Sequence, residues 1–466
     1  MNRRKLAVIG LDCATPQLVF GAFRDDLPNL KRLMAGGSWG KLRSTDPPIT
    51  VPAWLCMFTG CDPGKLGIYG FRNYRDYAYE KMTFATTLAV KEPAVWDVLA
   101  QHGIRSIVLG VPPSYPVPPL PGGTRVGCWL TPDASCEYTW PRELKRELAA
   151  QFGEYQFDVR DFRTDDKDYL KRQIGEMTDQ HFALARHLVT TRDWEFFAMV
   201  EIGLDRLHHG FWKYFDPQHR KFQPGSPHAG VIRDYYRQLD TRVGELLAAM
   251  PDDTTVLVVS DHGAQRMDGG FRINEWLRQQ GYLVLTTEPA TAQALEPGMV
   301  DWPKTRCWGE GGYYSRIMFN VRGRSPRGML AAGEVDAFRA ELTAKLELLD
   351  DDCGVPMRNR VLDPATLYPV RNGIAPDLMV YFGDLRWRSV GTVGGAAGVY
   401  VQENDTGPDD ANHDHHGIAI CYDPTRRGAG ERQGWELYDV GATVLAYFGL
   451  VPPAGWRGCD WHGGAQ

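Results

Sequence analysis

The sequence has no long apolar run and no excess of basic residues. A helix that spans a bilayer needs about 20 mostly apolar residues in a row, and no such stretch occurs. Lysine and arginine number 52 against 58 aspartates and glutamates, which gives a formal net charge of −6. Because no global positive field exists to attract phosphates, we expect neither a membrane partner nor a role as a nucleic-acid scaffold.

Paired cysteines are missing as well. The nine cysteines are scattered, odd in number and never spaced C-x-x-C, which argues against a disulfide framework and against a thiolate metal motif. The apolar run 6–11 is too short for the core of a signal peptide, and no small-residue cleavage site follows it. These features predict a reduced, cytoplasmic setting.

What the sequence does contain is an alternation of short apolar runs and helical patterns. Continuous β-rich runs are typical of strands buried on both faces, as in parallel sheets. Helical patterns such as 179–190 and 235–250 lie between them. The runs are 5–10, 104–109, 196–202, 254–260 and 378–382. This alternation predicts an α/β fold with helices on both faces of the sheet.

Two stretches interrupt the alternation. Residues 112–168 are rich in proline, glycine and aromatic residues, and residues 285–376 form a mixed segment that includes a helical pattern at 334–349. A chain of 466 residues has room for several domains. We interpret it as one domain over residues 1–466 that carries both stretches as insertions.

Three of the apolar runs are followed by an aspartate. In open α/β sheets, ligands bind outside the carboxyl ends of the strands, which is where Asp12, Asp205 and Asp261 are expected. A single aspartate in such a place is usually a helix cap or a turn residue. Three of them, two with histidines close by in the sequence, favour a ligand site.

Those histidines have spacings that suit metal ions. Asp205 and His209 are four residues apart, so in a helix both side chains point the same way. His262 directly follows Asp261, and His413 lies in a late Asn-His-Asp-His-His-Gly run, a pattern that is equally typical of a solvated loop. Oxygen and nitrogen ligands without a thiolate suit zinc first, with manganese, iron or cobalt as alternatives.

A proline-rich turn supplies a candidate nucleophile. Thr50 lies in the segment Pro-Pro-Ile-Thr-Val-Pro-Ala-Trp, just before a run with a helical pattern. A hydroxyl at the start of a helix sits where partial positive charge favours an anion. A lone threonine there is usually only a cap, and the metal constellation is what raises Thr50 above that reading.

Taken in order, these motifs resemble the alkaline phosphatase superfamily. They are Ala-Val-Ile-Gly-Leu before Asp12, the turn around Thr50, Asp-Arg-Leu-His-His from Asp205, and Ser-Asp-His-Gly around Asp261. The chain is most similar to the type I phosphodiesterase/nucleotide pyrophosphatase branch, in a group described as predicted phosphohydrolases or phosphomutases. The resemblance implies a three-layer αβα core with a mostly parallel sheet and inserted cap segments.

The resemblance also implies two divalent metal ions and a role for each candidate residue. One ion would be held by Asp12, Thr50, Asp261 and His262. The other would be held by Asp205, His209 and His413, with His416 as the alternative to His413. Thr50 would attack phosphorus and form a phosphothreonine.

The function implied is that of a metal-dependent phosphohydrolase, most specifically a phosphodiesterase, acting on a small-molecule phosphate ester. A phosphomutase or phosphomonoesterase using the same site is an alternative. A binding module on a dead enzyme scaffold is an alternative of another class, although such a protein usually loses ligands and here all seven ligand positions hold competent residues.

The chain departs from its relatives at two positions, one of which is Leu66, where many of them have a histidine. Nucleotide pyrophosphatases that resemble it carry an asparagine that contacts the phosphoryl oxygens, and here none follows Thr50 before Asn73. Lys65, Arg72 and Asn73 are substitutes by nearness in sequence only. The insertions also hold aromatic and basic residues that either meet the substrate or fill the core and surface: Trp129, Tyr138, Trp140, Trp302, Trp308, Arg125, Arg160 and Arg163.

Overall fold

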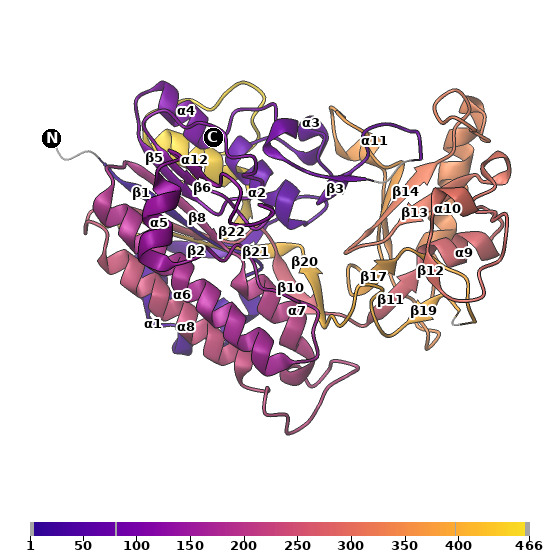
Figure 1. The fold of residues 1–466 in the computed structure, drawn as a ribbon, viewed down its shortest axis with the longest axis horizontal. Coiled ribbons are helices and arrows are strands. Elements are labelled where there is room, and N and C mark those ends of the chain that lie inside the picture. Colours follow the sequence, from indigo (N-terminus) through magenta and orange to yellow (C-terminus); the bar gives the residue numbers. More distant parts are fainter. Residues whose placement is uncertain (1–3, 80–81, 397, 462–466) are drawn as a thin grey trace.

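The structure is a computed structural model that describes residues 4–79, 82–396 and 398–461. The chain forms a larger lobe around a nine-stranded sheet and a small lobe, residues 269–401, beside it (Figure 1).

The central sheet is mostly parallel, as predicted. Its order is β22-β2-β21-β9-β1-β8-β5-β6-β7. β1 pairs in parallel with β8 and β9, and β21 and β7 bring in the antiparallel pairs. The strands are β1 (Leu6–Leu11), β2 (Ser38–Arg43), β5 (Ser106–Leu109), β6 (Thr124–Val126), β7 (Thr139–Trp140), β8 (Phe196–Glu201), β9 (Thr255–Val259), β21 (His416–Tyr422) and β22 (Gly430–Glu436).

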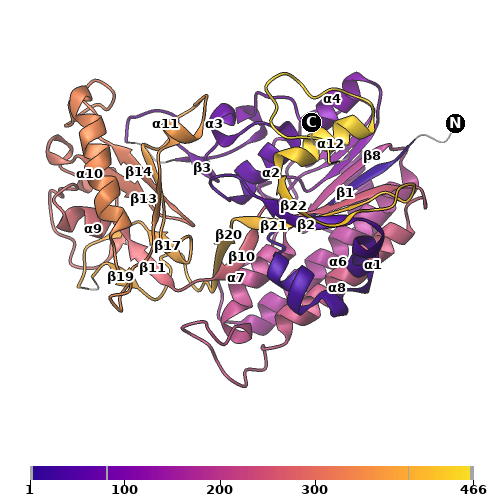
Figure 2. The same ribbon diagram turned by 180° about the vertical axis from the view of Figure 1, so that it is seen from behind.

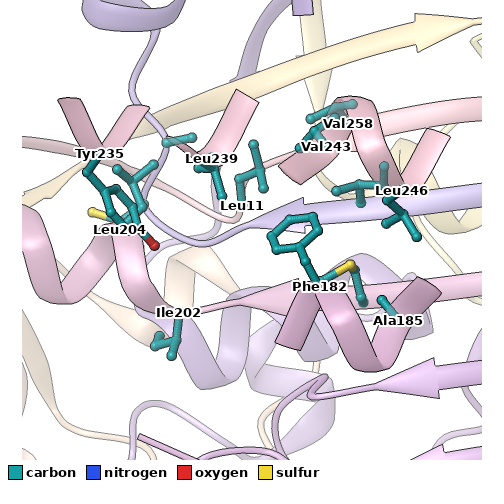
Figure 3. Packing of buried hydrophobic residues seen from close by; sticks show 14 of the residues in the cluster. Leu11, Phe182, Ala185, Ile202, Leu204, Tyr235, Leu239, Val243, Leu246 and Val258 are labelled. Carbon is teal, nitrogen blue, oxygen red and sulfur yellow. The ribbon is translucent and has the colours of Figure 1, made fainter. Parts of the chain in front are cut away.

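Helices cover both faces of this sheet, which confirms the α/β class. Side chains alternate along β1, so Ile9 and Leu11 pack into the core on one face and Leu6 and Val8 into the core on the other. Figure 3 shows the first core, where Leu11 and Val258 lie close to Phe182, Leu239 and Val243. The helices on that face are α1 (Pro28–Gly36), α5 (Leu144–Phe152), α6 (Lys167–Thr191), α7 (Gly203–Phe215) and α8 (Val231–Ala248). Those on the opposite face are α2 (Thr50–Thr59), α4 (Val95–Gln101) and α12 (Tyr438–Tyr447).

The small lobe has sheets and a hydrophobic core of its own. One sheet joins β17 (Trp387–Val390), β11 (Gly269–Arg272) and β19 (Tyr400–Val401). The other joins β13 (Cys307–Glu310), β14 (Ser315–Phe319), β16 (Leu378–Tyr381) and β15 (Arg360–Leu362). The remaining elements are α9 (Ile273–Gln279), α10 (Val335–Glu347), α11 (Pro364–Leu367), β12 (Gln293–Ala294) and β18 (Thr392–Val393).

Two details differ from the sequence-based picture. The run 378–382 was predicted as a strand of the main sheet, and it forms β16, which pairs antiparallel with β14 and β15 in the small lobe. A continuous apolar run indicates burial on both faces but does not indicate which sheet the strand joins.

The predicted insertion 285–376 is narrower than the small lobe. β6 and β7, which lie within the predicted insertion 112–168, extend the main sheet. The division into one domain with two insertions stays an interpretation.

Short elements connect the two lobes. β10 (Gly263–Arg266) pairs antiparallel with β20 (Ala411–Asp414), and both lie between the lobes in Figure 2. The segment after α2 holds α3 (Pro63–Leu66), β3 (Arg72–Asn73) and β4 (Thr83–Phe84).

No helix within the described ranges has both the length and the apolar composition that crossing a membrane requires. The cytoplasmic setting stays a prediction.

Candidate metal centre

The carboxyl ends of three neighbouring strands bring the predicted aspartates together. Since β1 lies between β8 and β9 and is parallel to both, the three strands end at the same edge of the sheet. Asp12 directly follows β1, Asp205 lies in the first turn of α7 after β8, and Asp261 follows β9. All three carboxylates are buried.

The first predicted ligand set gathers around the ring of His262. Its Nε2 lies 3.1 Å from Asp261 Oδ2, 3.7 Å from Asp12 Oδ1 and 3.2 Å from the Thr50 hydroxyl oxygen. Thr50 is the first residue of α2, as the proline-rich turn predicts. Four residues that are far apart in the sequence therefore surround one point.

The second ligand set adjoins the first. Asp205 Oδ1 lies 3.3 Å from His209 Nε2, one turn along α7, and 3.7 Å from His413 Nε2. The imidazoles of His262 and His413 stack with centroids 3.7 Å apart. Ligand atoms of Asp205, His262 and His413 lie within 4.8 Å of one another, so the two sets form one cluster.

Only the first histidine of the late run joins this cluster. His413 lies on β20, opposite Ala264 of β10, which places it beside His262. His416 is in β21, its side chain is 41% exposed, and its Nδ1 is 4.0 Å from Asp414. His415 is hydrogen-bonded to Asp384. The geometry therefore favours His413 over His416.

Five candidate metal-ligand atoms at the centre of the cluster are buried and have no hydrogen-bond partner among the described residues. They are Asp12 Oδ1, Asp205 Oδ1, Asp261 Oδ2, His209 Nε2 and His413 Nε2. Buried polar atoms are normally hydrogen-bonded, so a group of five in one place needs an explanation. Carboxylate oxygens and imidazole nitrogens are ligands for zinc and similar divalent ions, and these residues fit such ions.

The excess of negative charge in the cluster also indicates a site for divalent cations. No lysine or arginine in the described part of the chain forms an ion pair with Asp12 or Asp261. Burial raises the pKa of both carboxyls well above the usual value, and each is raised further by a neighbouring aspartate. Burial would also raise the pKa of Asp205, but His209 and Arg206 outweigh it and lower that pKa. Burial lowers the pKa of His262 to about 4, which favours the neutral imidazole that binds metal.

The remaining atoms of the ligands are held in place by their surroundings. The Nδ1 atoms of the three histidines bond to oxygen: His209 to Asp409 at 2.7 Å, His413 to the Pro48 carbonyl at 2.7 Å, and His262 to the Gly263 carbonyl at 3.1 Å. Each ring thereby directs its Nε2 into the cluster.

Trp54 of α2 holds Asp12 in place, and the Trp54 ring can approach β1 closely because residue 10 is a glycine. Trp54 Nε1 donates to Asp12 Oδ2 at 2.7 Å. A Cβ on Gly10 would lie 2.6 Å from the Trp54 ring and 2.7 Å from the Met199 carbonyl oxygen. We expect Gly10→Ala to lower the free energy of unfolding by about 1–3 kcal/mol, the usual cost of overpacking. Urea unfolding would measure it.

Gly21→Ala is the control for this change, because a Cβ there meets nothing within 4 Å. If both variants unfold like the parent protein, the close approach of Trp54 to β1 is not a constraint on the site.

Asp409 contacts a metal-ligand histidine, and the sequence alone did not identify it as part of the site. It is fully buried, accepts from His209 Nδ1, and receives hydrogen bonds from Arg163 and Arg388. Those partners hold the pKa of its carboxyl far below the usual range in spite of burial. Asp409 lies in a Gly-, Pro-, Asp- and Asn-rich stretch that reads as a loop, so the only signal was its place shortly before His413.

A cavity of about 750 Å³ opens beside the cluster and is lined by residues from both lobes. Of the aromatic and basic candidates in the insertions, Trp129, Arg163, Trp302 and Trp308 line it. The others are engaged elsewhere: Tyr138 packs on Tyr155, Trp140 donates to the Leu120 carbonyl, Arg125 pairs with Asp97, and Arg160 pairs with Glu154.

A known protein family matches most of the chain. The model of the family described as type I phosphodiesterase/nucleotide pyrophosphatase matches residues 6–418. A sequence search of curated proteins gives no match.

Similar folds occur among solved structures. Murine ectonucleotide pyrophosphatase/phosphodiesterase 5 has a TM-score of 0.55 at 13% identity, over 97% of this chain and 96% of that chain. An inactive form of the murine protein in complex with AMP has a TM-score of 0.56 at 12% identity, over 97% and 96%. The human protein has a TM-score of 0.53 at 12% identity, over 98% of each chain. At these identities the likeness is one of fold.

Proposed function

Because the chain belongs to the type I phosphodiesterase/nucleotide pyrophosphatase family, and is thus a hydrolase of phosphoric ester bonds, we propose that it is a metal-dependent phosphodiesterase with Thr50 as nucleophile. The observation that carries this proposal is the group of five unpartnered, buried donor atoms beside the Thr50 hydroxyl. A structural role does not require such atoms, whereas a metal centre does.

The residues assigned to the two ions are those of the two adjoining sets. Asp12, Thr50, Asp261 and His262 would hold one ion, and Asp205, His209 and His413 would hold the other. Zinc is the first choice and manganese, iron or cobalt the alternatives. When bound, two divalent ions lower the pKa of a coordinated hydroxyl and neutralise charge on the phosphoryl oxygens.

Thr50 itself performs the displacement. Its oxygen gives up its proton and forms a bond to phosphorus while the ester oxygen departs with the bonding electrons and takes up a proton, which leaves a phosphothreonine and a free alcohol. Water then attacks the same phosphorus atom and releases Thr50 with its proton restored. The start of α2 favours the negative charge that develops there.

The cavity supports a diester as the substrate. A volume of about 750 Å³ holds an organic group beside the phosphoryl group, and Trp129, which is only partly buried, offers aromatic surface for it. A phosphate monoester would need room for only one organic substituent. The AMP complex of the murine relative makes nucleotide esters the first compounds to test.

A paired rate assay tests this function. Protein reconstituted with zinc or manganese is given bis(4-nitrophenyl) phosphate and 4-nitrophenyl phosphate, and its metal content is measured. We expect about two ions per chain, as a two-metal site requires, and preferential cleavage of the diester. Preference for the monoester would favour the phosphatase or phosphomutase alternative. Absence of metal and of turnover would favour the non-catalytic scaffold.

Asp409 allows a test of the second ion. Asp409→Asn weakens the acceptor that orients His209, and we expect metal affinity to fall about 10- to 100-fold, the usual effect of losing such a partner. Competition with a chromogenic chelator measures it. Asp410→Asn is the matched control, because Asp410 is also buried but faces Lys213. Equal affinities for both variants would contradict the role given to Asp409.

A further inference from the structure

The small lobe delivers one side chain into the metal centre that no ligand set includes. Tyr313 lies in the loop between β13 and β14 and lines the cavity. Its ring stacks on the imidazole of His413, with centroids 4.0 Å apart and an interplanar angle of 25°. The His209 ring is 5.3 Å away and the Arg388 guanidinium is 4.2 Å from the Tyr313 centroid.

The surroundings of Tyr313 hold it in place without using its hydroxyl. Its backbone carbonyl accepts from Asn412 Nδ2 at 3.1 Å, and Arg388, which lies against its ring, is anchored on Asp409. The Tyr313 hydroxyl forms no hydrogen bond with the part of the chain that the structure describes. Arg163, Arg206 and Arg388 line the same cavity as Tyr313.

Two of the three candidates near Thr50 in sequence have side chains that are engaged elsewhere. The Asn73 side chain accepts from the Tyr69 amide and donates to the Gly70 carbonyl. Lys65 pairs with Glu92 at 3.4 Å. Arg72 packs on the exposed ring of Phe84, and both residues line the cavity. Neither Asn73 nor Lys65 therefore supplies a donor to the phosphoryl oxygens, and the donor must come from the residues that line the cavity.

We propose that Tyr313 is a further catalytic residue, whose hydroxyl donates a hydrogen bond to a non-bridging phosphoryl oxygen as Thr50 attacks. A chain of contacts places its ring beside the metal-ligand cluster: Thr50 touches His262, the His262 ring stacks on His413, and the His413 ring stacks on Tyr313, which also lines the cavity. The inference rests on the proposed function. It makes the small lobe a part of the active site, since that lobe carries the donor.

Tyr313→Phe tests the hydroxyl alone, because phenylalanine keeps the ring that stacks on His413. Loss of one preorganised donor to a developing oxyanion typically lowers kcat about 100- to 1,000-fold, and we expect a fall of that order in diester cleavage. KM and metal content should change little. Inhibition by orthovanadate, a five-coordinate mimic of the transition state, should weaken in proportion to kcat.

Tyr282→Phe is the control, since its hydroxyl also belongs to the small lobe but accepts from Lys345 at 2.7 Å. It should retain the parent kcat. An unchanged kcat in Tyr313→Phe would overturn the inference, and so would a rise in KM alone or a loss of bound metal, which would assign Tyr313 to ground-state binding or to support of His413. A parent protein that cleaves neither ester would reject the proposed function instead, so the two failures are distinguishable.

Discussion

Replacement of Thr50 by alanine should abolish diester cleavage and leave the fold intact. The Thr50 hydroxyl lies beside the metal-ligand cluster at the start of α2, and its oxygen is 3.2 Å from His262 Nε2. Loss of a nucleophile that acts together with its partners costs several orders of magnitude, and we expect a fall in kcat of roughly 10,000-fold or more. Steady-state rates with the reconstituted protein would measure it.

The metal content of Thr50→Ala distinguishes loss of the nucleophile from collapse of the site. Asp12, Asp261 and His262 remain as ligands of the first ion and the second ligand set is unchanged, so each set should still bind its ion. Thr59→Ala is the matched control, since Thr59 ends the same helix and its hydroxyl donates to the Leu55 carbonyl at 2.7 Å. That variant should lose about 1 kcal/mol of stability and keep its activity. Near-normal rates in Thr50→Ala would rule out the phosphothreonine route.

The elements that carry ligands were predictable because their signals are local. The runs that became β1, β8 and β9 are apolar and continuous, and each is followed within a few residues by its aspartate. Asp205 and His209 needed only the helical spacing of α7. Parallel pairing then brings the three strand ends to one edge, a consequence of α/β topology that requires no knowledge of side-chain contacts.

What the sequence could not reveal depends on contacts across long separations. His413 meets His262 because β20 pairs with β10 in the register that sets His413 opposite Ala264. Tyr313 reaches the centre through the folding of the small lobe, and Asp409 lies in the segment before β20; the local sequence of both is that of ordinary loops. The misassigned run 378–382 has the same cause, since burial on both faces is equally possible in either sheet.

Removal of the metal ions should destabilise the protein as well as inactivate it. Ions that bind only the folded state stabilise it by about 2.7 kcal/mol per site at a concentration 100 times the dissociation constant. Dialysis against a chelator should therefore lower Tm and abolish cleavage of the diester, and zinc or manganese should restore both. A Tm that does not respond to chelation would contradict the presence of a divalent cation.

The decrease in Tm on removal of the ions should become larger as the pH rises. Without ions, the folded-state pKa values of Asp12 and Asp261 are raised by burial, so their contribution to stability is present below the unfolded value and is lost as pH rises through the folded value. Asp205, whose pKa is lowered, acts in the opposite direction. Bound ions require ionised carboxylates and bind more tightly as pH rises, because binding releases protons. The difference in Tm between reconstituted and chelated protein should thus be larger at about pH 8 than at about pH 5. In Asp12→Asn, which lacks one of these carboxylates, both the difference and its dependence on pH should shrink.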